Sequence, residues 1–193
     1  MGRKANLASN TITTKPRREN DFYPTPKKAV EPVLRHLLEY GNFCEPCAGD
    51  GALIRHLEDL TDGGMWCSKA YDIDPQAKVA TFNVPIEQRN ALNLGPQDVL
   101  LCDLIITNPP YQWDMLKPLL EHLPSLKPTW LLLPFSYACN KRMAPYMKVC
   151  KKLVPIGRVK WIEDSKQSST DDFGWYLFDS DYIGTTKLYP RNE

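Results

Sequence analysis

The stretch that constrains this chain most is residues 103–111, where a short apolar run meets two consecutive prolines. Residues 104–107 are apolar or β-branched without polar alternation, which is typical of a strand buried on both faces of a parallel sheet. Pro109 and Pro110 must end that strand, because proline donates no backbone hydrogen bond and fixes its own φ. A residue before proline is disfavoured in helical conformations, so Asn108 is expected to be extended at the strand's carboxyl end. Ligands of open α/β sheets bind at this edge.

A Gly-x-Gly turn at Gly49 and Gly51 is the second constraint. A short apolar strand precedes the turn, and a helix is expected after it, with Leu53, Ile54 and Leu57 on its apolar face. Strand, glycine turn and helix form a nucleotide-binding geometry, in which glycine lets the backbone approach a ligand closely. The turn therefore predicts a ligand site at the end of this strand.

An acidic pair, Asp72 and Asp74, follows a second predicted strand at residues 65–71. An acid about 20 residues beyond the glycine turn is where this architecture binds ribose hydroxyls, so Asp72 is the predicted ribose ligand. The alternative is that both acids cap the next helix.

Residues 21–26 read Asp-Phe-Tyr-Pro-Thr-Pro and open the predicted domain. Thr25 is expected to cap a helix that begins at Pro26. Apolar residues then recur at helical spacing over residues 30–38, which predicts an amphipathic helix with one apolar stripe. Phe22 and Tyr23 allow two interpretations: a hydrophobic staple on this helix, or part of a ligand site.

Cys44 and Cys47 form a single C-x-x-C pair. A zinc site would need a second pair of ligands, and the three histidines are scattered without paired spacing. The sequence therefore predicts packing roles for both cysteines and no metal site. The six cysteines lie mostly in apolar stretches, including Cys102, Cys139 and Cys150, which is typical of reduced, buried thiols, so no disulfide is expected.

These motifs, in this order, resemble those of S-adenosylmethionine-dependent methyltransferases. Asn-Pro-Pro-Tyr after a buried strand resembles the catalytic motif of enzymes that methylate amino groups on planar systems, and Glu-Pro-x-Ala-Gly-x-Gly-x-Leu resembles their first cofactor motif. Tyr23-Pro24-Thr25-Pro26 resembles the N-terminal cofactor motif of N6-adenine methyltransferases. The resemblance covers nearly all of residues 21–193. It implies an α/β, Rossmann-like methyltransferase fold: a mostly parallel seven-stranded sheet with an antiparallel C-terminal hairpin and helices on both faces.

The resemblance also implies roles for individual residues. The catalytic residues would be Asn108, Pro109, Pro110 and Tyr111. S-adenosylmethionine would be bound by residues from every motif: Phe22, Tyr23, Thr25, Glu45, Pro46, Gly49, Gly51, Asp72, Ile73, Asn90 and Asn108. Asn90 stands where the family commonly carries an acid that accepts from the adenine amino group, and an amide oxygen can also accept that bond. The substrate would be bound by Tyr111, Lys141, Arg142, Lys151, Lys152 and Trp175, with Phe173 as an alternative to Trp175 for the aromatic wall opposite Tyr111.

The implied reaction is methylation of the N6 amino group of adenine in DNA. The Asn108 side-chain oxygen and the Pro109 carbonyl would accept the two amino hydrogens, and Tyr111 would stack on a base flipped out of the duplex. Transfer would be a direct in-line displacement that depends on orientation and electrostatics. Methyltransferases of RNA bases and of protein glutamine share Asn-Pro-Pro-Tyr, so they are the first alternative. A non-catalytic nucleic-acid binder is the second.

Charge is unevenly spread along the chain. Residues 1–18 carry five basic residues and no acid, which predicts a flexible basic tail over residues 1–20 that either touches phosphates or only solubilises the protein. Residues 141–166 carry eight basic residues against two acids, and residues 138–152 were expected to form a basic amphipathic helix. Such a zone favours an anionic partner, nucleic acid in particular, although a solvated helix face would explain part of it.

The remaining length is enough for one domain. Residues 21–193 are predicted to form a single methyltransferase catalytic domain without a separate target-recognition domain, which leaves recognition to the tail, to the loop at residues 163–172 or to a partner, either a second copy or another subunit. This compact form is similar to solitary methyltransferases of phages and mobile elements. No apolar run is long enough to span a bilayer, and no signal peptide is evident, so the protein is expected in the cytoplasm, of the host if it is phage-encoded.

Overall fold

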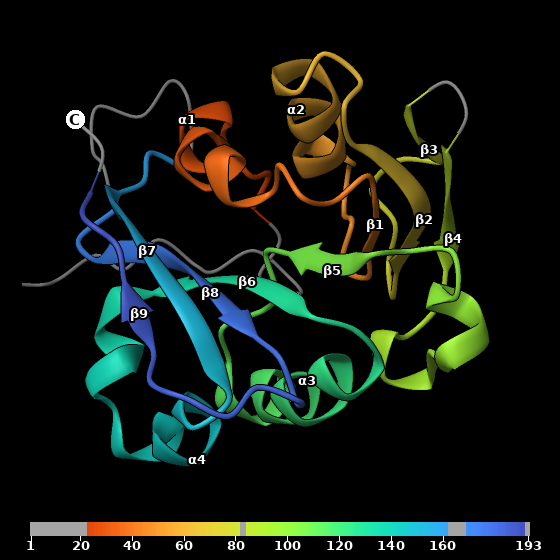
Figure 1. Cartoon of the computed structure of the whole chain (residues 1–193). Helices are drawn as coiled ribbons and strands as arrows, with labels where there is room; N and C mark the ends of the chain where they lie inside the picture. The colour runs from red at the N-terminus through yellow and green to blue at the C-terminus, as the bar shows by residue number, and fades with distance from the viewer. Residues whose placement is uncertain (1–22, 82–83, 162–168, 192–193) are drawn as a thin grey trace, which may run out of the picture.

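A computed structural model describes residues 23–81, 84–161 and 169–191 of the 193 in the chain. These residues form a nine-stranded sheet of order β3-β4-β2-β1-β5-β6-β8-β7-β9 (Figure 1). The strands are β1 (Asn42–Glu45), β2 (Trp66–Asp72), β3 (Val79–Thr81), β4 (Val84–Gln88), β5 (Leu104–Thr107), β6 (Thr129–Pro134), β7 (Cys150–Arg158), β8 (Asp172–Phe178) and β9 (Lys187–Leu188). Strands β4, β2, β1, β5 and β6 pair in parallel, and β8 lies antiparallel between β6 and β7.

The predicted α/β fold is therefore confirmed, with one correction to the number of strands. The seven central strands include the expected antiparallel element near the C-terminus, and the two edges each gain a short strand, β3 and β9. Both edge strands are only two or three residues long, with no clear apolar alternation by which the sequence could have marked them.

Helices cover both faces of the sheet. One face carries α1 (Lys27–Val30), its 3₁₀ continuation Glu31–His36, and α2 (Ala52–Leu60). The other carries α3 (Trp113–Leu126) and α4 (Ala144–Met147). Short 3₁₀ segments complete the connections at Ala91–Asn93, Pro96–Val99, Phe135–Cys139 and Lys141–Met143. No helix within the described ranges is both long enough and apolar enough to cross a bilayer.

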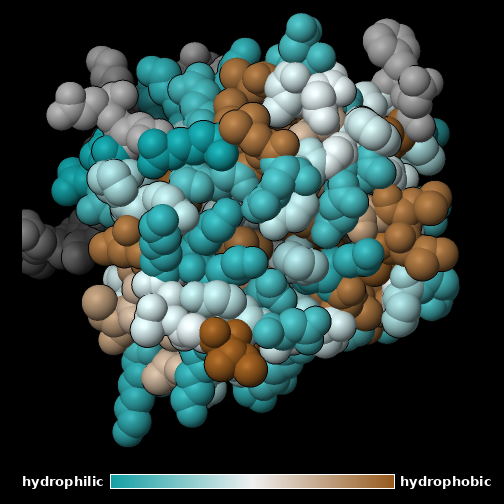
Figure 2. All heavy atoms as spheres, in the orientation of Figure 1, coloured by the Kyte–Doolittle hydropathy of each residue, from teal (hydrophilic) through white to brown (hydrophobic). Residues whose placement is uncertain are grey.

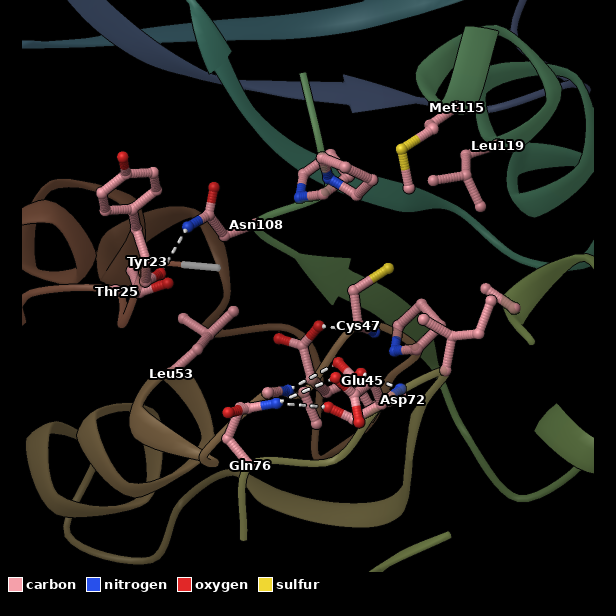
Figure 3. A pocket seen from close by; sticks show the side chains of 18 of the residues that line it. Tyr23, Thr25, Glu45, Cys47, Leu53, Asp72, Gln76, Asn108, Met115 and Leu119 are labelled. Carbon is pink, nitrogen blue, oxygen red and sulfur yellow. Dashed lines mark hydrogen bonds between the residues drawn. The ribbon is translucent and has the colours of Figure 1, made fainter. Parts of the chain in front are cut away.

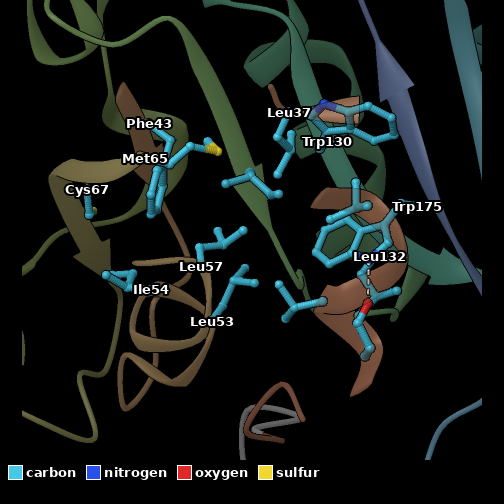
Figure 4. Packing of buried hydrophobic residues seen from close by; sticks show 14 of the residues in the cluster. Leu37, Phe43, Leu53, Ile54, Leu57, Met65, Cys67, Trp130, Leu132 and Trp175 are labelled. Atoms are coloured by element: carbon cyan, nitrogen blue, oxygen red, sulfur yellow. Dashed lines mark hydrogen bonds between the residues drawn. The ribbon is translucent and has the colours of Figure 1, made fainter. Parts of the chain in front are cut away.

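Alternation along the central strands builds two cores. Leu104 and Ile106 belong to the cluster under α1 and α2, whereas Ile105 belongs to the cluster under α3. All three are fully buried, as expected for a strand covered on both faces. Figure 4 shows the first cluster, in which Leu53 and Leu57 from α2 lie on one side and Trp130, Leu132 and Trp175 on the other. Each large apolar side chain contributes about 1.5–3 kcal/mol when fully buried, so this packing fixes the positions of the strand ends that carry the site.

Two predicted helices differ from the structure. The apolar stripe over residues 30–38 is interrupted because Pro32 cannot donate to Lys28, and the chain tightens into a 3₁₀ helix that leaves Leu38 83% exposed. The basic helix expected over residues 138–152 is absent. In its place are a 3₁₀ turn, the four-residue α4 and the beginning of β7 at Cys150.

Candidate active site

A cavity of about 260 Å³ lies where β1, β2 and β5 end, and its wall is built from segments far apart in the sequence. Figure 3 shows Tyr23 and Asn108 on one side, Glu45 and Asp72 below, and Met115 and Leu119 across from them. The cavity brings together most of the residues singled out above: Tyr23, Thr25, Glu45, Pro46, Gly49, Asp72, Ile73, Asn90, Asn108, Pro109, Pro110 and Tyr111. Phe22 and the tail lie outside the described residues.

The glycine turn shapes the floor of the cavity. Gly49 has a φ of 54°, in the left-handed region, and Gly51 has a φ of 79° at the position that starts α2. A Cβ on Gly51 would lie 2.6 Å from the Ala80 Cα, a distance that atoms do not tolerate. Gly51 does not itself line the cavity, so its predicted cofactor contact is replaced by a role in packing the turn against β3. Gly49 does line it.

Asp72 locks this turn to the end of β2. Its Oδ2 accepts a hydrogen bond of 2.8 Å from the Gly49 amide, and its Oδ1 accepts one of 2.8 Å from the Asp74 amide. The residues that follow β2 form bends and not a helix, so the alternative that Asp72 and Asp74 cap a helix is wrong. The carboxylate is half-buried on the cavity wall, where it has further lone pairs that a ligand could use.

One end of the cavity is apolar. Ile73 is 55% exposed and Leu92 38% exposed, although both line the cavity, together with Ala91. Exposed apolar side chains in a concave site offer contact area to a flat ligand. Asn90 stands beside them, and its Oδ1 accepts a hydrogen bond of 2.9 Å from the Leu92 amide. That bond holds the 3₁₀ turn and leaves a second lone pair on the oxygen for a ligand.

Glu45 is buried at the end of β1, with 1% of its surface exposed. Burial raises the pKa of its carboxyl to about 8, although the hydrogen bond from the Cys47 amide opposes the shift. The Cys47 amide donates to Oε1 at 3.2 Å. At neutral pH most of this carboxyl is therefore protonated, and a cation placed in the cavity would favour its ionised form.

Asn108 is held on both sides of its amide. Its Nδ2 donates to the Tyr23 carbonyl at 3.4 Å, and its Oδ1 accepts from the Tyr111 hydroxyl at 2.5 Å. The Tyr111 carbonyl in turn accepts from the Tyr137 hydroxyl at 3.0 Å. These bonds join the strand end to the N-terminal segment and orient the amide so that its oxygen faces the Tyr111 ring.

An aromatic cluster adjoins Tyr111. The Tyr111 ring centroid lies 5.6 Å from that of Phe173 and 6.4 Å from that of Trp161. Trp161 also lies 6.3 Å from Tyr23 and meets Phe173 edge-on at 5.0 Å. Trp161 was not singled out in the sequence. The signal available was its position directly after Lys160 and close to Arg158, because an aromatic residue beside basic residues is typical of a nucleic-acid site.

Trp175 does not have the role expected of it, and Thr25 does not cap α1. Trp175 is fully buried on β8, and its indole N–H donates to the Ala29 carbonyl at 2.7 Å, so it packs the core and is not a substrate wall. Phe173, two residues away on the same face of β8, is the residue of this pair whose ring lies near Tyr111. Pro26 occupies the cap position of α1 without a side-chain bond, whereas Thr25 is buried on the cavity wall.

The basic residues predicted to bind substrate do not form one surface. Lys151 and Lys152 are neighbours at an irregular point of β7, and each lies beside a different acid. Lys151 lies 3.8 Å from Asp179, and Lys152 lies 3.5 Å from Glu39. Lys141 and Arg142 belong to a separate 3₁₀ turn, where the Arg142 guanidinium lies 5.8 Å from the centroid of the Trp113 ring. The linear cluster is thus divided by the fold.

The cysteines have mostly structural places. Cys44, Cys67, Cys102 and Cys150 are buried, Cys47 is half-buried on the cavity wall, and none of the six is in a disulfide. Cys139 is exposed, contrary to expectation, because the segment that contains it is a surface turn. The described residues contain no group of acids, cysteines and histidines arranged to hold a metal ion.

Comparison with known proteins gives likeness in structure alone. No protein-family model and no curated protein sequence matches the chain. A candidate class I S-adenosylmethionine-dependent methyltransferase from Listeria monocytogenes superposes with a TM-score of 0.60 at 12% identity, covering 85% of this chain and 64% of that one. A type I restriction-modification methyltransferase subunit from Streptococcus thermophilus gives a TM-score of 0.55 at 10% identity, covering 83% of this chain and 45% of that one. The chain therefore spans less than two thirds of either neighbour. It has the Rossmann-like fold of these methyltransferases.

Proposed function

We propose that this protein transfers a methyl group from S-adenosylmethionine to the N6 amino group of adenine in DNA. The observation that carries the proposal is the convergence of four motifs on one cavity: the segment at Tyr23, the glycine turn, Asp72 and Asn108-Pro109-Pro110-Tyr111. The hydrogen bond from Asn108 to the Tyr23 carbonyl joins the predicted catalytic motif to the segment whose resemblance points to adenine.

The lining of the cavity fits S-adenosylmethionine from end to end. Ile73 and Leu92 offer an apolar surface for the adenine ring, and Asp72 offers carboxylate lone pairs for the ribose. Glu45, buried near the glycine turn, suits the cationic methionine end. The volume of about 260 Å³ lies near the lower end of the roughly 300–1,000 Å³ of small-molecule sites, so the cofactor would fill it.

When bound, S-adenosylmethionine supplies an electrophilic methyl group. The adenine amino group is a poor nucleophile because its lone pair is delocalised into the ring, so the protein must orient that lone pair. Asn108 Oδ1 and the Pro109 carbonyl accept the two amino hydrogens, which directs the lone pair along the line of transfer. The bond from Asn108 Nδ2 to Tyr23 fixes which end of the amide faces the substrate. Orientation of this kind can contribute about 7–11 kcal/mol to lowering a barrier.

Tyr111 has two parts in this scheme. Its hydroxyl already occupies Asn108 Oδ1, and an arriving amino group takes the place of that hydroxyl. Its ring then stacks on the base, which offsets part of the cost of unstacking when the base leaves the duplex. Phe173 and Trp161 lie beside the ring, with centroids 5.6 Å and 6.4 Å from its own.

Labelled product analysis tests the proposal. The protein is incubated with methyl-labelled S-adenosylmethionine and, in separate reactions, duplex DNA, single-stranded DNA, RNA and a protein extract; digested products are then identified by mass spectrometry. We expect N6-methyladenine in DNA. Label in an RNA base or on a glutamine amide would replace the proposed substrate, and cofactor binding without any labelled product would indicate a non-catalytic binder.

A further inference from the structure

A second concavity, apart from the cavity described above, lies between the start of α1 and the end of β7. It is a groove of about 770 Å³, and five of the eleven residues that line it are basic. The basic residues are Lys27, Lys28, Arg158, Lys160 and Arg191, with Glu31 as the acid on the same wall. All five are exposed, and none forms an ion pair with another residue of the described segments. The hydrophilic cover over α1 and the adjoining end of β7 is visible at the upper left of Figure 2.

The groove is assembled from distant parts of the chain. Lys27 and Lys28 belong to α1. Arg158 ends β7, Lys160 follows it, and Arg191 is the last described residue. Gly157, with a φ of 78°, makes room for the arginine. A Cβ at Gly157 would lie 2.6 Å from the Arg191 Cζ, so the guanidinium rests on this backbone. The fold therefore concentrates positive charge that the sequence disperses.

The groove runs into the aromatic edge of the candidate active site. Tyr23, Pro24 and Thr25 line the cavity, and Pro26 to Lys28 continue along the groove. On the opposite wall, Lys160 is followed by Trp161, whose ring lies 6.3 Å from Tyr23 and 6.4 Å from Tyr111. Positive charge beside a cluster of aromatic side chains on which bases can stack is the usual combination in grooves that bind a nucleic-acid strand.

We infer that this groove holds the sugar-phosphate backbone of the strand that presents the target base to Tyr111. The inference rests on the proposed function for the identity of the reaction, but its own content is the location of the phosphates. Each basic side chain that neutralises a phosphate releases counterions, which makes binding weaken with salt. The paired lysines on β7, Lys151 and Lys152, would then contribute little.

Salt titrations of nucleic-acid binding test the groove. Binding of a fluorescent duplex oligonucleotide is measured between low and moderate salt for the wild type, for Lys27→Gln/Lys28→Gln and for Arg158→Gln/Lys160→Gln. If each removed side chain contacts one phosphate, each pair should make the log–log slope shallower by about 1.8, at about 0.9 per phosphate. The matched control is Lys69→Gln/Lys117→Gln, which removes the same charge from β2 and α3, and should leave the slope unchanged.

Further measurements separate this inference from the proposed function. Thermal unfolding and calorimetry with S-adenosylhomocysteine check that each variant is folded and keeps its cofactor affinity. A further variant, Lys151→Gln/Lys152→Gln, is titrated in the same way. If the slopes are unchanged in both groove pairs, or if only this further variant has a shallower slope, the groove does not hold the phosphates, even if the wild type methylates DNA. Absence of nucleic-acid binding by the wild type would also overturn the inference. Shallower slopes in the groove pairs, with no methyl transfer to any nucleic acid, would support the groove and contradict the proposed reaction.

Discussion

Asp72→Ala is the substitution that most directly tests the interpretation of the cavity. The Asp72 carboxylate accepts two backbone hydrogen bonds of 2.8 Å and lies on the cavity wall. Its loss should have two separable effects. The protein should become less stable because the Gly49 amide loses its partner, and S-adenosylmethionine should bind less tightly because the ribose loses an acceptor.

The structure sets the size of each effect. Loss of the bond to the exposed Asp74 amide should have little effect on stability, because water can replace the carboxylate there. Loss of the acceptor for the part-buried Gly49 amide should lower the free energy of unfolding by about 1–2 kcal/mol. Loss of a charged acceptor for the ribose should cost about 1–3 kcal/mol, which corresponds to roughly a 5- to 150-fold rise in Kd. Denaturant unfolding measures the first quantity, and titration calorimetry with S-adenosylmethionine measures the second.

Asp103 provides a matched control for the structural effect. Its Oδ2 also accepts two backbone hydrogen bonds, of 2.8 Å from Gly41 and 2.9 Å from Asn42, but it lies before β5, away from the cavity. These bonds hold the pKa of the Asp103 carboxyl below its usual value. Asp103→Ala should destabilise the protein by a smaller amount, because both of its bonds are exposed, and should leave cofactor affinity unchanged. Equal affinity in folded Asp72→Ala and Asp103→Ala proteins would refute the assignment of the ribose site to Asp72.

Three further predictions concern the remaining polar groups of the cavity. Asn108→Ala should remove most methyl transfer and change the cofactor Kd less than about threefold, because in the proposed mechanism the amide faces the acceptor base. Activity within a few-fold of wild type, measured by label incorporation, would contradict that mechanism. Tyr111→Phe keeps the stacking ring and removes the hydroxyl from Asn108 Oδ1, so it should retain methyl transfer, whereas Tyr111→Ala should lose most of it; equal losses in the two variants would argue against stacking. The pKa of Glu45 is raised from 4.5 to about 8, so the folded state binds more protons than the unfolded state between those pH values, and the stability of the wild type should fall as the pH rises from about 5 to 8. In Glu45→Gln that fall should be smaller. If the stabilities of the two proteins, measured by unfolding, change in parallel over this pH range, Glu45 is not buried as described.

The parts of the fold that the sequence predicted well are those set by local chemistry. The run at residues 104–107 became β5, buried on both faces, because four apolar or β-branched residues followed closely by two prolines leave few other solutions. The glycine turn likewise sits between β1 and α2, with both glycines at positive φ. In each case the residues that determine the conformation are adjacent in the chain.

The failures occur where a pattern depends on distant partners. Residues 138–152 have basic and apolar residues at spacings compatible with a helix, but Cys150 begins a nine-residue strand that pairs with β8 and β9. Pairing with strands that come later in the chain overrode the local preference. Trp175 illustrates the same limit, because a tryptophan near the end of a chain gives no sign that its indole will bond to the Ala29 carbonyl.

The two sides of the site therefore differ in how far the sequence can define them. The cofactor side is built from turns at the ends of parallel strands, and each turn carries its own ligand residues, so motifs in order predict residues in one cavity. The substrate side is built across the sheet, where Trp161 after β7 meets Tyr23 before α1 and Tyr111 after β5. No single segment encodes that contact. Lys151 and Lys152 are adjacent in the sequence, yet each is paired with a different acid. Lys27 and Arg191 are far apart in the sequence, yet they line one groove. Charge clustered along the chain is consequently a weaker guide to a nucleic-acid surface than charge brought together by the fold.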